Sequence, residues 1–259
     1  MSPSGQVNQL HADTAPQGLR VTSRFLALYR LMLRLQVTRA RLTALTIGGA
    51  FAVLVAFVLR GSHQSNVTQV GAVLIGEYGL WLLVPITALL LSSATLGEVY
   101  DEGTLVYLWL RPVPRWQLAV SSFLSSLTVA LPITLIPLLA AATATGASSD
   151  LITGVLLTVP LSLFAYCGAF CALGLISRRC FIWGLLYIFI IEGFVARGGE
   201  SLAKLAIRSY SESLLSGLTG ADLRPFDVIA PPYSWIVPLA VGFLGVLLTI
   251  RRLRVQDIP

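Results

Sequence analysis

Charged residues are scarce in this 259-residue sequence, in which Asp, Glu, Lys and Arg together account for 12% of the positions and hydrophobic residues for 56%. Soluble globular proteins contain about 25% charged residues. The mean hydropathy of +0.81 reflects the same imbalance. This composition excludes a water-soluble fold and predicts a protein that is embedded in a lipid bilayer.

Residues and motifs that support common enzymatic chemistry are also few. The three cysteines, Cys167, Cys171 and Cys180, lie in or beside apolar runs, which argues against a secreted disulfide framework. No GxxxxGKS/T motif is present, so the chain cannot bind ATP as a P-loop protein does, and HExxH, GxSxG and CxxC motifs are absent as well. We therefore expect no enzymatic activity, no cofactor bound by this chain and no metal site.

Long apolar runs, in contrast, are abundant. A membrane-spanning helix needs about 20 mostly apolar residues. Six runs meet this criterion, which predicts an all-α integral membrane protein with one six-span domain over residues 42–254. We place the spans at about 42–59, 78–96, 117–141, 151–176, 180–195 and 233–250.

Two amphipathic segments accompany these spans. Between Arg20 and Arg41 the arginines cover one half of a helical wheel, and the other half is apolar, which predicts an interfacial helix with its apolar side in the acyl boundary. The residues before it are polar, so residues 1–41 are expected to form a disordered N-terminus followed by this helix. The second segment, 201–218, lies within the outer stretch 196–232 and is predicted to be helical, with a solvated loop as the alternative. The apolar half of the first wheel contains Phe25, Tyr29, Met32 and Leu33.

The arginines also predict an orientation. If both termini lie on one side of the membrane, most of the eighteen basic residues lie on that side too. The positive-inside rule then places both termini in the cytoplasm of a multi-pass protein in the cell membrane. The net charge of +6 is explained by this orientation, and no nucleic-acid partner is expected. The basic residues left on the outer side are Arg60, Arg197, Lys204, Arg208 and Arg224.

A charged connector separates the second and third predicted spans. Residues 97–115 read GEVYDEGTLVYLWLRPVPR and carry three carboxylates, Glu98, Asp101 and Glu102. Such a segment must lie at the water interface, where its backbone and charges are solvated. It is therefore suited to contact with a soluble partner, although the same charges would also serve to cap a helix and solvate a loop.

The connector and the six-span architecture resemble the type-2 ABC transporter permease family. In that family the second and third spans are joined by an acidic–x–Gly-Thr-Leu segment that is followed by Pro-Val-x-Arg; here these are residues 101–105 and 112–115. The family often has a lysine a few residues after that arginine, where this sequence has residues 119–122, AVSS.

The resemblance implies a permease subunit that exports a hydrophobic or amphipathic substrate by alternating access, paired with a second copy or a related permease. ATP and Mg²⁺ would be bound by a separate ATPase subunit. The connector, 97–116, would couple the two subunits. The residues to which the resemblance gives this role are Glu98, Tyr100, Asp101, Glu102, Gly103, Thr104, Leu105, Arg111, Pro112 and Arg115.

Glu192 is the only carboxylate in a strongly apolar run, IFIIEGFV. An ionisable residue at membrane depth is a functional candidate because its desolvation must be offset by a partner or a polar cavity. We consider Glu192 a candidate contact on the substrate pathway; the alternative is pairing with Arg197 or another basic residue near the outer interface. Glu77 is expected at the outer end of the second span. An intramembrane enzyme or secondary transporter that uses Glu192 is the alternative function.

Two further patterns have structural explanations. Cys167 and Cys171 lie one helical turn apart, a spacing at which two thiolates can hold Cu(I), but buried cysteine usually behaves as a small hydrophobic residue. Trp81 and other tryptophans lie near predicted span ends, which is typical of an aromatic belt at the lipid headgroups.

Overall fold

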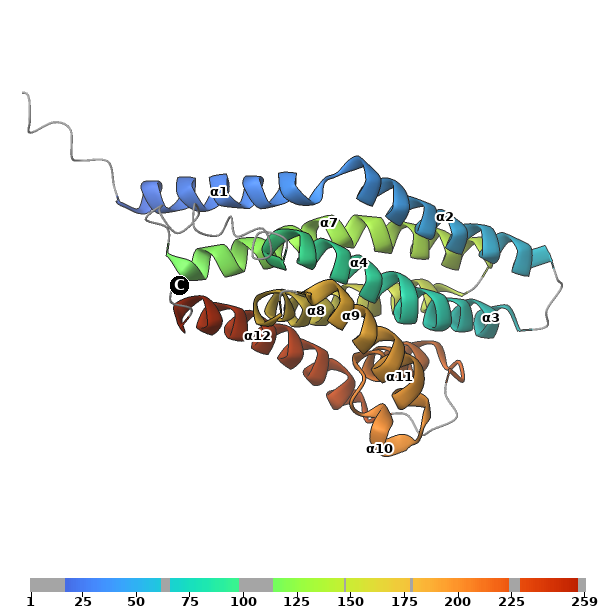
Figure 1. Cartoon of the computed structure of the whole chain (residues 1–259). Helices are drawn as coiled ribbons and strands as arrows, with labels where there is room; N and C mark the ends of the chain where they lie inside the picture. The colour runs from blue at the N-terminus through green and yellow to red at the C-terminus, as the bar shows by residue number, and fades with distance from the viewer. Residues whose placement is uncertain are drawn as a thin grey trace, which may run out of the picture.

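The computed structural model describes residues 17–61, 66–97, 114–146, 148–177, 179–223 and 229–255, and no β-strand occurs among them. Five helical segments in these ranges are long and apolar enough to cross a membrane. They lie side by side as a bundle (Figure 1). The segments are α2 (Arg39–Gly61), the continuous run α3 (Val67–Leu74), η1 (Ile75–Leu83), α4 (Val84–Ser92) and η2 (Ser93–Gly97), α7 (Arg115–Ala144), α8 (Ser149–Ile176) and α12 (Pro231–Val255).

A further apolar helical segment is shorter and consists of α9 (Cys180–Leu186) and η3 (Tyr187–Phe194). It leads through η4 (Val195–Arg197) and α10 (Glu200–Ala203) to α11 (Ile207–Thr219). We call the end of the bundle at which α7 begins and α12 ends the proximal end, and the opposite end the distal end (Figure 1). The described part of the chain is thus helical and contains the several long apolar helices expected of a multi-pass membrane protein.

The second long helix begins earlier than expected, at Val67 rather than near residue 78. The side chain of Asn66 caps its first turn by accepting a hydrogen bond of 3.3 Å from the backbone N–H of Gln69. The helix then continues without interruption through η1. As a result Glu77 and Trp81 lie inside the helix, not at its end.

Segment 201–218 is mostly helical, as expected, because α11 covers its second half. Gly220 ends α11 in the left-handed region with φ of 66°, and its backbone N–H donates to the carbonyl oxygen of Ser216 over 2.8 Å. The N-terminal part of α11 is buried on nearly all sides, including Ile207, Leu214 and Leu215. The solvated-loop alternative is therefore wrong for this part of the chain.

The most deeply buried long helix is α8, which packs against α12, α7, α11 and α4. Its contact with α12 is formed by glycines: a Cβ atom on Gly168 would overlap the backbone of Gly242, and one on Gly245 would overlap the backbone of Gly168. Small residues allow membrane helices to approach this closely. The two helices therefore form one tightly packed unit.

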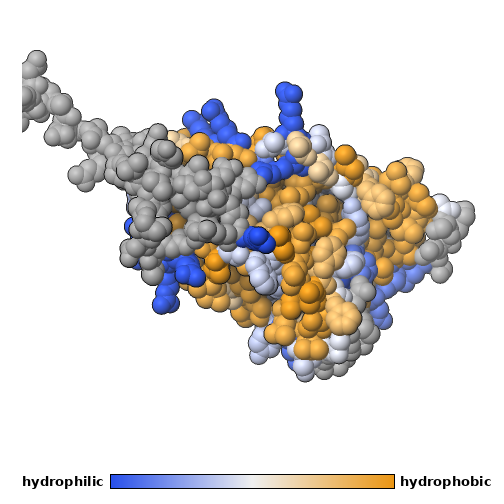
Figure 2. Space-filling view, viewed as in Figure 1, coloured by the Kyte–Doolittle hydropathy of each residue, from blue (hydrophilic) through white to orange (hydrophobic). Residues whose placement is uncertain are grey.

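Much of the outer surface is apolar, as lipid contact requires. Figure 2 shows hydrophobic residues over most of the visible described surface. Large side chains such as Ile47 (69% exposed) and Phe57 (67%) on α2 and Leu247 (60%) on α12 face outward. These helices present lipid, or another membrane protein, with a continuous hydrophobic face.

The N-terminal helix α1 (Gln17–Gln36) lies along the proximal part of α7 (Figure 1). Arg30 and Arg34 are exposed, whereas Met32 is fully buried against α7, α8 and α12. The buried amide group of Gln36 is 2.9 and 3.1 Å from the hydroxyl oxygens of Ser125 and Ser126. Part of the side of α1 that was expected to lie in lipid therefore contacts protein, and the interfacial position of this helix stays a prediction.

Candidate functional site

Most of the residues predicted to couple the chain to an ATPase, from Glu98 to Pro112, lie outside the described residues. Arg115 is the one member of that set that the structure describes. It is the first residue of α7, and its Nη1 atom donates to the carbonyl oxygens of Leu253 and Arg254, both over 2.8 Å. These carbonyls belong to the last turn of α12, where a helix has no backbone donors for them.

A cation at this position also interacts favourably with the negative end of the α12 dipole. Leu253 is itself fully buried, in a small cluster that includes Met32 of α1 and Leu118 of α7. Three helices therefore meet where the connector enters α7. We call this contact between Arg115 and the carbonyls of Leu253 and Arg254 the proximal junction.

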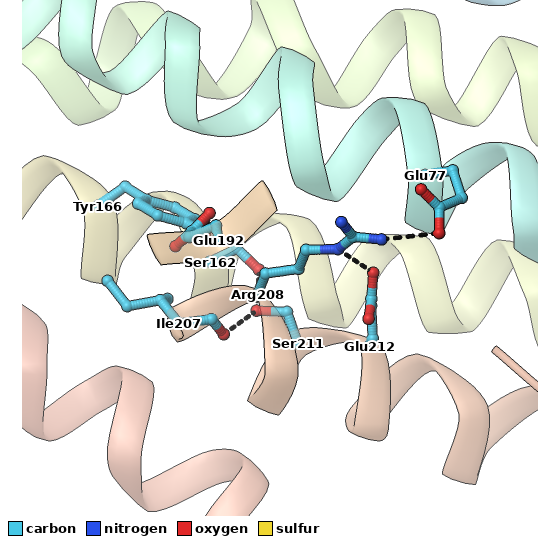
Figure 3. Close-up of polar contacts among 8 residues, drawn as sticks. All are labelled: Glu77, Ser162, Tyr166, Glu192, Ile207, Arg208, Ser211 and Glu212. Carbon is cyan, nitrogen blue, oxygen red and sulfur yellow. Dashed lines mark hydrogen bonds and ion pairs between the residues drawn. The ribbon is translucent and has the colours of Figure 1, made fainter. Parts of the chain in front are cut away.

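Glu192, the candidate pathway residue, is fully buried in η3. Its closest polar partner is Tyr166 of α8, which is also fully buried. The hydroxyl oxygen of Tyr166 is 2.6 Å from each carboxyl oxygen of Glu192 (Figure 3). The predicted alternative partner was Arg197, whose side chain is not described.

A buried arginine lies beside this pair. Arg208 of α11 is 5% exposed, and its Nη2 atom is 2.9 Å from a carboxyl oxygen of Glu77 on η1. Its Nε atom donates to the carboxylate of Glu212, one turn along α11 (Figure 3). The guanidinium group also lies over the ring of Trp81, 5.4 Å from the ring centroid.

These partners keep Arg208 charged. Burial alone would lower the pKa of its guanidinium group, but the carboxylates of Glu212 and Glu77 more than offset this effect and hold the pKa above its ordinary value. A buried charge requires such pairing, because an isolated one is strongly destabilising. Arg208 therefore ties α11 to η1 through an ion pair and an aromatic contact.

Neutral hydrogen bonds attach α11 to other helices. The hydroxyl groups of Ser162 on α8 and Ser211 on α11 are hydrogen-bonded over 2.7 Å. The hydroxyl of Ser213 donates to the carbonyl oxygen of Ile229 over 3.0 Å, just before α12 begins. Helix α11 thus contacts η1, α8 and the start of α12 through polar side chains.

We call the charged and aromatic group around α11 the ionic cluster. It contains three carboxyl groups and one guanidinium group, so it can carry a net negative charge. In Figure 3 the side chain of Arg208 points toward Glu77 and Glu212 and away from Glu192. No group of three or more His, Cys, Asp or Glu side chains in the described part of the chain is arranged to hold a metal ion. The members of the cluster are Glu77, Trp81, Tyr166, Glu192, Arg208 and Glu212.

The sequence identified Glu192 but not its partners. Arg208 and Glu212 form an i, i+4 pair of opposite charge in an amphipathic stretch of the sequence. This signal favours a helix but does not indicate that Glu77 also binds Arg208. Trp81 was expected in an aromatic belt; its half-buried ring lies against the guanidinium group of Arg208, a contact that the sequence did not indicate. Nothing in the sequence distinguishes Tyr166 from the other tyrosines.

The two cysteines at helical spacing are in the interior. Cys167 and Cys171 are fully buried on α8 and form no disulfide. This environment is that of small core residues.

Comparison with known proteins returns no matching family model and no curated relative.

Proposed function

We propose that this chain is the membrane-spanning subunit of an ABC transporter and that a separate ATPase subunit drives it. Its multi-pass helical architecture and the motif at residues 101–105 and 112–115 support this proposal. The observation that carries it is the proximal junction. The residue that ends the motif, Arg115, is bonded to the end of the last long helix, so a force on the connector would reach α7 and α12 together.

In the proposed orientation the proximal end is cytoplasmic. The exposed arginines of α1 and those at the end of α12 would then face the cytoplasm and anionic lipid headgroups. The segment α9–η3 would be the sixth span. It is shorter than the about 20 residues that usually cross a bilayer, and α10 and α11 would complete the structure on the outer side.

The proposed mechanism is alternating access at an interface between two permease subunits, either two copies of this chain or this chain and a related one. The hydrophobic outward faces of α2 and α12 provide area for such contact. A route between apolar helices suits a hydrophobic or amphipathic substrate, and the direction would be export.

The test is purification of the full-length protein from native membranes, followed by measurement of ATP hydrolysis and identification of co-purified P-loop subunits. The wild-type protein should retain a stoichiometric ATPase. The double variant Asp101→Arg, Glu102→Arg should lose it, because repulsion replaces attraction at the interface and can cost several kcal/mol of association free energy.

Asp150→Arg is the matched control, because Asp150 is exposed in the first turn of α8 at the distal end. It should retain the ATPase. Thermal unfolding should be similar for all three proteins, since exposed substitutions usually change stability by less than about 0.5 kcal/mol. Purification of wild-type protein without any P-loop subunit would contradict the proposal.

The second candidate function is a secondary transporter or intramembrane enzyme that uses Glu192. The complete burial of this carboxyl group beside Tyr166 favours it. Proteoliposomes separate the two candidates: a secondary transporter moves substrate in response to an ion gradient without ATP, whereas the ABC subunit alone does not.

A further inference from the structure

Glu192 lies among titratable groups from every helix packed around it. Its direct partner is the phenol of Tyr166, and its carboxyl group also interacts with Tyr187 and with the backbone N–H of Arg208 at the start of α11. The described charged and titratable side chains around it are Tyr166 on α8, Tyr187 on η3, Arg208 and Glu212 on α11, and Glu77 on η1.

The one guanidinium group that the structure describes in this region is already paired. Arg208 binds Glu77 and Glu212, and its side chain points away from Glu192 (Figure 3). Among the described side chains, no Lys or Arg forms an ion pair with Glu192. An ionised carboxylate without a cation at this depth is strongly unfavourable, and uptake of a proton removes the charge.

The contact with Tyr166 fits a neutral carboxyl group. Two oxygen–oxygen contacts of 2.6 Å join Glu192 to one phenol oxygen. A phenol has one hydrogen to donate and can also accept a hydrogen bond. With a protonated Glu192, the phenol donates to one carboxyl oxygen and accepts from the other, so that each contact contains a hydrogen.

We propose that Glu192, with Tyr166, is a proton-binding site that controls the docking of α11. The Glu192 carboxylate takes up a proton from water and becomes a carboxylic acid; no other bond is made or broken. Release of this proton leaves an ionised carboxylate in a fully buried position next to the start of α11. A movement of α11 that admits water to this carboxylate then becomes more favourable, so release of the proton weakens the docking of α11. This site is independent of the energy source for transport.

Infrared difference spectroscopy of the full-length protein in nanodiscs tests the site directly. The wild-type protein at neutral pH should show the C=O stretching band of a buried carboxylic acid, and Glu192→Gln should lack it. Glu77→Gln is the matched control and should keep the band, because the Glu77 side chain is half exposed and paired with Arg208. Absence of the band from the wild-type protein, or its persistence in Glu192→Gln, would overturn the proposal.

Tyr166→Phe keeps the test decisive if Glu192→Gln does not fold. Removal of the phenol should shift the frequency of the band, because the carboxyl group loses a hydrogen-bond partner. A band at the wild-type frequency in Tyr166→Phe would show that the acid is another residue.

Hydrogen exchange tests the effect on α11. In the wild-type protein the protection of α11 amides, corrected for intrinsic rates and relative to α8, should fall by up to about tenfold per pH unit as the proton is released. Glu192→Gln cannot release it, so its α11 protection should not depend on pH. An equal pH dependence in both proteins would refute control by Glu192, whether or not an ATPase co-purifies.

Discussion

Arg115 and Arg208 both connect helices that are far apart in the sequence, but their surroundings differ. Arg115 is exposed and binds uncharged carbonyl oxygens at the end of α12. Arg208 is buried and binds carboxylates on two elements. Water can replace the bonds of Arg115 when the helices move, whereas separation of α11 from η1 would take the buried Arg208 away from Glu77 and from the ring of Trp81. The contact of Arg115 therefore opposes helix movement less than the contact of Arg208 does.

The largest effect is expected from Arg208→Met, which breaks the ion pair between two buried side chains, Arg208 and Glu212. Breaking a buried ion pair in this way costs about 3–5 kcal/mol. The measurement is the free energy of unfolding in mixed detergent micelles. The triple variant with Glu77→Gln and Glu212→Gln should recover part of the loss, because it also removes the negative charges that Arg208 binds. An Arg208→Met protein of wild-type stability would mean that the cluster does not hold α11.

A smaller difference in stability is expected between variants of the two carboxylates that bind Arg208. Glu212 is buried, whereas the side chain of Glu77 is 48% exposed. We expect Glu212→Gln to lower the free energy of unfolding by about 2 kcal/mol more than Glu77→Gln, since exposed ion pairs contribute about 0–1 kcal/mol. Equal losses would show that water does not reach Glu77 in the membrane.

Arg115→Gln is expected to lower the free energy of unfolding by only about 1 kcal/mol, because an exposed hydrogen bond to a charged group contributes little. If the proximal junction transmits force, transport per ATP hydrolysed should fall much more than stability. Arg251→Gln, an exposed neighbour on α12, is the control and should keep both wild-type values. Loss of stability without loss of coupling would make Arg115 a helix cap only.

The smallest effect concerns the attachment of α1. The hydroxyl of Tyr29 donates to the hydroxyl of Thr128 on α7 over 2.9 Å. Tyr29→Phe should cost less than about 1 kcal/mol, because the lost bond is exposed. Met32→Ala should cost more, about 2–3 kcal/mol, since Met32 is fully buried. Comparison of the two by thermal unfolding shows whether packing or hydrogen bonding holds α1. Equal losses of stability in the two variants would contradict the expectation that packing, more than hydrogen bonding, holds α1 in place.

The helices were largely predictable because the signal is local. Apolar runs of spanning length must be helical in lipid, and α2, α7, α8 and α12 lie close to the predicted spans. The start at Val67 was missed because Gly71, Gly76 and Glu77 interrupt the apolar run, while the cap at Asn66 and the neighbouring helices still support a helix there. The boundary between the amphipathic helix and the first span was predicted after residue 41, but α1 already ends at Gln36 and α2 begins at Arg39.

The site was predictable only in part. Glu192 stood out because a carboxylate in an apolar run needs compensation. Its partner depends on how η3 packs against α8, and the partners of Arg208 depend on α11 lying against η1. The coupling role of residues 98–112 remains a prediction from the family resemblance, as these residues lie outside the described part of the chain.

The sequence by itself determined that the chain is helical and membrane-embedded, and it located the few charges that interrupt the apolar runs. Hydropathy is a sum over neighbouring residues, so a single sequence is enough to evaluate it. Only the tertiary structure decided that Arg208 meets Glu77, that Tyr166 meets Glu192 and that Arg115 meets the end of α12. Each of these pairs joins helices whose proximity is set by side-chain packing across the whole bundle, and no local pattern encodes it.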